Sequence, residues 1–214
     1  MTKKNAFTLA ELLITLAIIG VIAALTIPAV MFSTDEKQAA AGLKKAMMTL
    51  NQAVDMARTE IKFQPNPKCY IDPDGDSDTS QCEDLFKYMK NIMQVQKYCK
   101  EDPVGNECVA EFVPAEAPCE GWNDLSAKQG FLTADGMNFF LYAANDPTVI
   151  GVDVNGFRGP NKWGYDIFSL QLTGTKTTMQ QYEPGGCEYA MEGGKTGTQL
   201  LEESDEEEAA ASTP

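Results

Sequence analysis

The hydrophobic pattern separates an apolar first part of the chain from a mixed second part. Residues 12–32 are almost all apolar. Because a helix needs about 20 apolar residues to cross a bilayer, we predict a membrane-spanning helix over residues 7–32. A carboxylate, Glu11, lies within the first turns of this helix. A charge inside a membrane is costly and usually marks a functional site, so Glu11 is a candidate for one.

After this run, apolar residues recur at three- and four-residue spacing up to about residue 59. They are Ala39, Ala40, Leu43, Ala46, Met47, Leu50, Ala53, Val54 and Ala57. The spacing predicts an amphipathic continuation of the helix over residues 33–64. Two positions in the first part favour a kink: Gly20 lacks a side chain, and Pro28 removes a backbone hydrogen bond.

Residues 65–200 are predicted to form a globular α+β head. We expect a short helix at residues 83–98, followed by strands at Gly130–Thr133, Met137–Ala143, Val149–Val154 and Asp166–Leu172. Short turns between successive strands favour an antiparallel sheet, which would pack on the long N-terminal helix. Residues 201–214 are acidic and rich in Ala and Ser, so we predict a disordered tail.

Six cysteines lie in the part of the chain that follows the apolar run: Cys69, Cys82, Cys99, Cys108, Cys119 and Cys187. An even number of cysteines in an exported region predicts three disulfides. Sequence alone permits many pairings. We favour Cys69–Cys82 and Cys99–Cys108 as local loops, with Cys119–Cys187 as a long-range link.

The charge and the missing histidine argue against two classes of function. A net charge of −14 leaves no surface suited to neutralising phosphates, so we expect no nucleic-acid binding. The chain contains no histidine, which removes the commonest general base and every triad that uses one. No Gly-x-Ser-x-Gly motif or Gly-rich phosphate loop is present either. We therefore expect that the protein is not an enzyme.

The N-terminus resembles that of type IV pilins and type II secretion pseudopilins. The residues that carry the resemblance are Lys3, Lys4, Ala6, Phe7, Thr8, Leu9, Glu11, Leu12, Leu13, Gly20 and Pro28. The resemblance implies that a prepilin peptidase cuts between Ala6 and Phe7 and methylates the new amine of Phe7. Residues 1–6 would then be a leader peptide, and Glu11 would pair with the Phe7 amine of a neighbouring subunit. The chain departs from the family at Ala6, where the usual residue is Gly.

The same resemblance implies the partners and the location. It indicates a pilin-like fold and a structural subunit of a type IV pilus-like filament or a type II secretion pseudopilus. Partners would be homologous subunits, the prepilin peptidase and an inner-membrane assembly platform. Lys3 and Lys4 favour a cytoplasmic N-terminus in the bacterial inner membrane, with a periplasmic or extracellular head. Two alternatives remain open: a membrane-anchored binding domain that never polymerises, and a secreted enzyme released by a signal peptidase.

Two acidic segments are candidates for calcium. Asp72, Asp74, Asp76, Asp78 and Glu83 have the spacing of five ligand positions in an EF-hand loop. The glycine falls at a different position from that of the motif, so a solvated acidic turn is the competing interpretation. Asp153 and Asn155 form a second candidate, in competition with a tight turn at Asn155-Gly156. The segment from Val152 to Phe168 also resembles sheet-and-loop segments of bacterial prepilin-like proteins.

Overall fold

The computed structural model describes residues 8–60, 88–115, 124–126, 128–143, 148–172, 180–181 and 193–212. Within these ranges, the side chains of residues 27–34, 142, 143, 148, 172, 180 and 181 are outside the description. The chain forms two compact units, Met1–Gln38 and Ala39–Pro214. The leader at residues 1–6 and the segment at residues 61–87 lie outside the described residues.

Helix α1 spans Leu9–Glu60, a length of 52 residues, and confirms the predicted N-terminal helix. Two threonines interrupt its apolar run, and both hydroxyls bond to the helix itself. The Thr15 hydroxyl donates to the Leu12 carbonyl oxygen at 3.0 Å, and the Thr26 hydroxyl donates to the Ile22 carbonyl oxygen at 3.0 Å. These bonds satisfy the hydroxyl protons without water, as a membrane interior requires.

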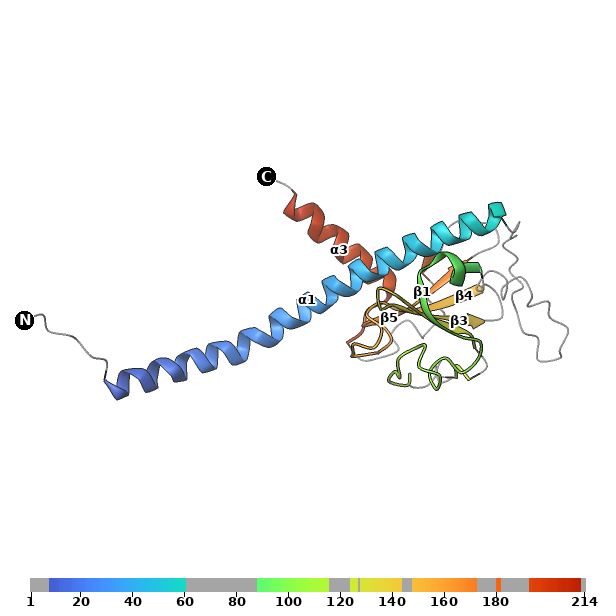
Figure 1. The fold of residues 1–214 in the computed structure, drawn as a ribbon. Coiled ribbons are helices and arrows are strands. Elements are labelled where there is room, and N and C mark those ends of the chain that lie inside the picture. Colours follow the sequence, from blue (N-terminus) through green and yellow to red (C-terminus); the bar gives the residue numbers. More distant parts are fainter. Residues whose placement is uncertain are drawn as a thin grey trace, which may run out of the picture. The chain divides into compact units, whose positions relative to one another are not determined.

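The second unit buries one face of α1 against a sheet (Figure 1). The buried helix residues are Ala39, Ala40, Leu43, Ala46, Leu50, Ala53, Val54 and Ala57. They share one core with strand residues that include Phe131, Phe139, Ile150 and Leu170. Small residues bring the helix close to the sheet: a Cβ added at Gly42 would lie 2.8 Å from the Val154 Cβ. The predicted α+β fold, with the helix packed on an antiparallel sheet, is confirmed.

Within the described residues, six strands follow one another across the sheet in chain order, and each neighbouring pair is antiparallel. They are β1 (Val95–Cys99), β2 (Gly130–Thr133), β3 (Asn138–Ala143), β4 (Thr148–Asp153), β5 (Ile167–Leu172) and β6 (Gln180–Gln181). The four predicted strands correspond to β2, β3, β4 and β5, with ends that agree to within one residue. In Figure 1, the strands labelled β3, β4 and β5 lie side by side.

The predicted helix over residues 83–98 is wrong in its second half. Residues 88–92 are helical, but Val95–Cys99 is strand β1. This segment pairs with β2, with Tyr98 opposite Phe131 and Cys99 opposite Gly130. The ladder to β2 stabilises the extended form of a segment whose apolar spacing is also compatible with a helix, which is how tertiary pairing overrides local propensity.

The prediction of a disordered acidic tail at residues 201–214 is also corrected. Gly197–Ala211 forms helix α3. A capping box starts it, because the Thr196 hydroxyl accepts from the Gln199 N–H and the Gln199 side chain accepts from the Thr196 N–H. Leu200 is buried in the main core. The capping box and the buried Leu200 together stabilise a helix that the acidic composition alone does not predict.

One predicted disulfide lies within the described residues and is confirmed. Cys99 and Cys108 are bonded across a sequence separation of 9. The loop between them is tight: the Asp102 carboxylate accepts from the Gly105 N–H at 3.0 Å, and both Asp102 and Glu107 have positive φ. The other four cysteines, Cys69, Cys82, Cys119 and Cys187, lie outside the described residues.

Candidate functional site

Glu11 is hydrogen-bonded to Thr8, the residue directly before α1. Its Oε2 atom accepts from the Thr8 N–H at 2.8 Å and from the Thr8 hydroxyl at 2.8 Å. The Glu11 N–H donates to the Thr8 hydroxyl oxygen at 3.3 Å. This is a capping box, in which each residue satisfies a backbone N–H that the first helical turn leaves open. Neither Thr8 bond uses the second carboxylate oxygen, Oε1.

The sequence contains a signal for this cap that was not among the predicted features. Thr8 and Glu11 have the spacing Thr-x-x-Glu before an apolar run, which is the sequence signature of a capping box. Thr196 and Gln199 repeat the signature at the start of α3. Glu11 therefore has a local structural role that a loss-of-function substitution would also disturb.

Between Leu9 and Thr26, helix α1 exposes its apolar side chains in every direction. Residues Leu9–Thr26 are long and apolar enough to cross a membrane, and none of this window is buried. Leu9 and Leu25 are 77% and 74% exposed. So much apolar surface on one helix is stable only in lipid or against other apolar helices.

Several predicted site residues cannot be placed. Ala6 and Phe7, at the predicted cleavage site, lie outside the described residues, as do the calcium candidates Asp72, Asp74, Asp76, Asp78 and Glu83. The Pro28 side chain is outside the description, and Gly20 has open space around it. The cleavage, kink and first calcium site remain predictions.

The second calcium candidate, Asp153 and Asn155, lies at the start of the connection between β4 and β5. The Asp153 Oδ1 atom accepts from the Asn155 N–H at 3.2 Å and from the Gly156 N–H at 2.7 Å, so the predicted tight turn is present. At the other end of the connection, the Asp166 carboxylate accepts from the Asn161 N–H at 2.8 Å and from the Lys162 N–H at 2.7 Å. The Val154 N–H donates to the Asp166 carbonyl oxygen at 2.9 Å and joins the two ends.

Both carboxylates are withdrawn from water. Asp153 is fully buried and Asp166 is 2% exposed. Burial, together with the nearby Asp166 carboxylate, raises the pKa of Asp153 to about 8, against the opposing effect of the Gly156 and Asn155 N–H groups. Burial also raises the pKa of Asp166, although the N–H groups of Lys162 and Asn161 oppose it. Two carboxylates that are both charged and buried close together repel each other, unless one of them holds a proton or a cation binds to both.

Three oxygen atoms on this connection are buried without a hydrogen-bond donor. They are Asp153 Oδ2, Asn155 Oδ1 and Asn161 Oδ1. A buried oxygen without a partner is costly, and a set of them beside carboxylates is the donor type that a hard cation takes. In the part of the chain that the structure describes, no group of three or more Asp, Glu, Cys or His side chains converges. A cation here would therefore rely on two carboxylates and amide oxygens.

The fold fixes the shape of this connection. Gly156 has a φ of +63°, and a Cβ there would lie 1.8 Å from the Gly136 carbonyl oxygen. Asn161 takes a φ of +50°. Trp163 is buried and meets the Phe140 ring edge-on at 6.1 Å between centroids. Asp166 and Asn161 could not be predicted from the sequence, because only the pairing of β4 with β5 brings residues 153 and 166 together.

Comparison with curated proteins and with solved structures gives no significant match. One family model matches the chain, over its first residues only. The match implies processing by a prepilin peptidase, assembly with other pilin subunits and anchoring in a membrane. Residues 1–27 carry the prokaryotic N-terminal methylation motif, the prepilin-type signature of type IV pilins and pseudopilins.

Proposed function

We propose that this protein is a structural subunit of a type IV pilus-like filament or a type II secretion pseudopilus. The supporting observation is an exposed apolar helix that begins with a capped carboxylate, in a chain that carries the methylation motif. Before assembly, lipid would cover the helix; in the filament, the apolar helices of other subunits would cover it. The head would face outward and form the filament surface, and the protein would have no catalytic role.

The geometry of Glu11 suggests how it serves assembly. Its Oε2 atom carries both Thr8 contacts, so Oε1 can accept from the Phe7 amine of a neighbouring subunit without loss of the cap. A carboxylate and an ammonium group buried together offset part of the desolvation of each. Glu11 would thus hold its own helix end and recognise the next subunit at the same time.

The mass of the mature chain tests the processing step. We expect a protein that begins at N-methylated Phe7 in cells that express the prepilin peptidase, and the full Met1 form in cells that lack it. An intact Met1 form in both strains would favour a plain membrane anchor. A cut near residue 29 would favour a secreted domain.

Two substitutions at Glu11 separate its charge from its capping role. Glu11→Gln keeps an oxygen acceptor for the Thr8 donors and removes the charge, whereas Glu11→Ala removes both. We expect both variants to be processed and to fail in assembly, measured as sheared filaments or as crosslinked oligomers. Normal assembly of Glu11→Gln would show that the charge is not required and would refute the pairing with Phe7.

We propose, as a second and separate function of the head, that the β4–β5 connection binds a divalent cation, with calcium the best fit. The three unpartnered oxygens carry this proposal. Asp153 and Asp166 supply two negative charges, which a divalent ion would neutralise. All donors are oxygen atoms, which suits calcium and disfavours zinc. The ion would tie the start of the connection to its end and so stabilise this part of the head.

Thermal unfolding of the full chain in detergent, with calcium or with EDTA, tests the cation. We expect calcium to raise the midpoint for the wild type. Asp153→Asn keeps an Oδ1 acceptor for the Asn155 and Gly156 N–H groups and removes one of two like charges. It should therefore raise the midpoint in EDTA and abolish the response to calcium. If the wild type does not respond to calcium and Asp153→Asn is still stabilising, then the site holds a proton and the proposal is refuted.

A further inference from the structure

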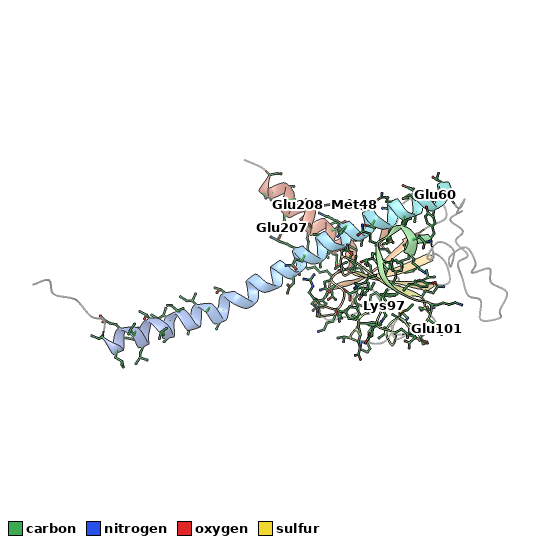
Figure 2. All side chains as sticks on the ribbon, in the orientation of Figure 1. Met48, Glu60, Lys97, Glu101, Glu207 and Glu208 are labelled. Carbon is green, nitrogen blue, oxygen red and sulfur yellow. A yellow bond between two sulfur atoms is a disulfide. The ribbon has the colours of Figure 1, made fainter. Side chains whose placement is uncertain are left out.

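The two halves of α3 are held in different ways. The first half has the capping box at Thr196 and the buried anchor Leu200, and Leu201 is half-buried against the same core. The second half, from residue 202 to the end of the helix at Ala211, is mostly exposed and contains six acidic residues and no basic residue. Figure 2 labels two of these acids, Glu207 and Glu208, on the distal turns of α3.

Charge makes the second half a poor helix by itself. Acidic side chains three or four residues apart repel each other, as at Glu202 with Glu206 and at Glu203 with Glu207. Glu207 and Glu208 also lie near the C-terminal end of the helix, where the helix dipole disfavours negative charge. Beyond Leu201 only Ser204 is half-buried, so attraction to nearby cations is needed to offset this repulsion.

Lys44 of α1 is such a cation. Its Nζ atom lies 2.7 Å from Asp205 Oδ1 and 3.3 Å from Glu208 Oε1, and it donates to the Ser204 hydroxyl at 3.1 Å. These three groups lie on one face of α3, at positions 204, 205 and 208. The pKa of Lys44 is raised, first by the hydrogen bond to Asp205. Lys195 adds a contact to Glu203 at 2.6 Å, closer to the anchored half.

We infer that the distal half of α3 is a releasable strap, docked on α1 through Lys44 and able to undock and unfold while the Thr196–Leu201 half stays anchored. Undocking would release the Lys44 Nζ atom from Asp205, Glu208 and Ser204. The strap belongs to the head alone, so this inference does not depend on filament assembly.

Lys45 offers a matched control for Lys44. The two residues are neighbours on α1, but the Lys45 Nζ atom pairs with Asp135 of the β2–β3 turn at 2.6 Å. A reversal of charge at either position changes the net charge of the chain equally. Only the reversal at Lys44 removes a contact to α3 that the structure shows.

Hydrogen exchange of the full chain in detergent, read by mass spectrometry, tests the strap. We expect Lys44→Glu to speed exchange of the amides at residues 203–211 about tenfold or more, because it replaces an attractive charge with a repulsive one. The amides of residues 200 and 201 should remain protected in this variant. Lys45→Glu should leave α3 as in the wild type, and the charge swap Lys44→Glu with Asp205→Lys should restore most of the protection.

Three results would overturn the inference. The first is distal exchange in Lys44→Glu that equals the wild type, whether both are protected or both are open. The second is an equal effect of Lys44→Glu and Lys45→Glu, which would indicate a response to net charge. The third is a loss of protection over the whole of α3, which would show that the helix undocks as one piece.

Discussion

Gly151 is the position in the sheet where one added methyl group has the clearest consequence. It lies opposite Phe140 across the β3–β4 ladder. A Cβ at Gly151 would lie 2.0 Å from Phe140 Cε2 and 2.1 Å from Cζ. Ordinary carbon contacts are about 3.5–4.0 Å, so the Phe140 ring would have to move by about 1.5 Å.

The surroundings of Phe140 resist that movement. The side chain is fully buried, and its ring meets the Trp163 ring edge-on. Overpacking of a core typically costs about 1–3 kcal/mol. Because both the strand and the ring are constrained, we expect Gly151→Ala to destabilise the head by about 3 kcal/mol, at the top of that range. For a domain of this size the unfolding midpoint should fall by roughly 6–12 °C.

A double-mutant cycle checks the cause. The smaller side chain in Phe140→Leu removes the ring atoms that the new methyl group meets. In that background Gly151→Ala should cost about 1 kcal/mol or less, so the two changes should couple by about 2 kcal/mol. Thermal and denaturant unfolding, followed by circular dichroism, measure both values. The steric argument fails if Gly151→Ala leaves the midpoint unchanged, or if its effect is the same with Leu at position 140.

Three further predictions concern the disulfide, the buried carboxylate and the cleavage site. Replacement of Cys99 and Cys108 by Ser should lower the free energy of unfolding by about 3 kcal/mol, from the entropy of a loop of this length; an unchanged denaturant midpoint would contradict this. In EDTA, the raised pKa of Asp153, about 8, means that the folded chain holds a proton that the unfolded chain releases. The resulting stability is complete below about pH 4 and is lost as the pH rises through about 8. The unfolding midpoint should therefore fall across this range, and Asp153→Asn should reduce the slope; an equal slope in both proteins would refute the assignment. Ala6→Gly should speed conversion to the mature form in a timed gel assay with the peptidase, whereas equal rates would show that Ala6 is tolerated fully.

Features that depend on neighbours along the chain were predictable from sequence. The apolar run and the three- and four-residue spacing correspond to a single helix, Leu9–Glu60. Short runs of apolar and β-branched residues bounded by turn residues predicted β2 to β5. The local disulfide Cys99–Cys108 was predictable for the same reason.

Features that depend on distant contacts were not predictable from sequence. Val95–Cys99 is a strand because β2 pairs with it, more than 30 residues later in the chain. The acidic segment after Leu201 is helical where Lys44, far away in sequence, compensates part of its charge. Asp153 and Asp166 come close because the two ends of one connection meet where β4 pairs with β5. In each case the deciding partner lies outside any local window.

The side of β5 that faces away from β4 affects how readily the sheet pairs with a strand of another molecule. An edge strand with open backbone groups can recruit a strand from another molecule. Here the Ile167 N–H donates to the Lys162 carbonyl oxygen, and the Ile167 carbonyl oxygen accepts from the Gly164 N–H at 3.0 Å. Further along, β6 pairs with Leu170 and Gln171. The loop that carries the candidate cation site thus also covers the backbone of Ile167 at the start of β5. A loosened loop would open this backbone to pairing with a strand from another molecule.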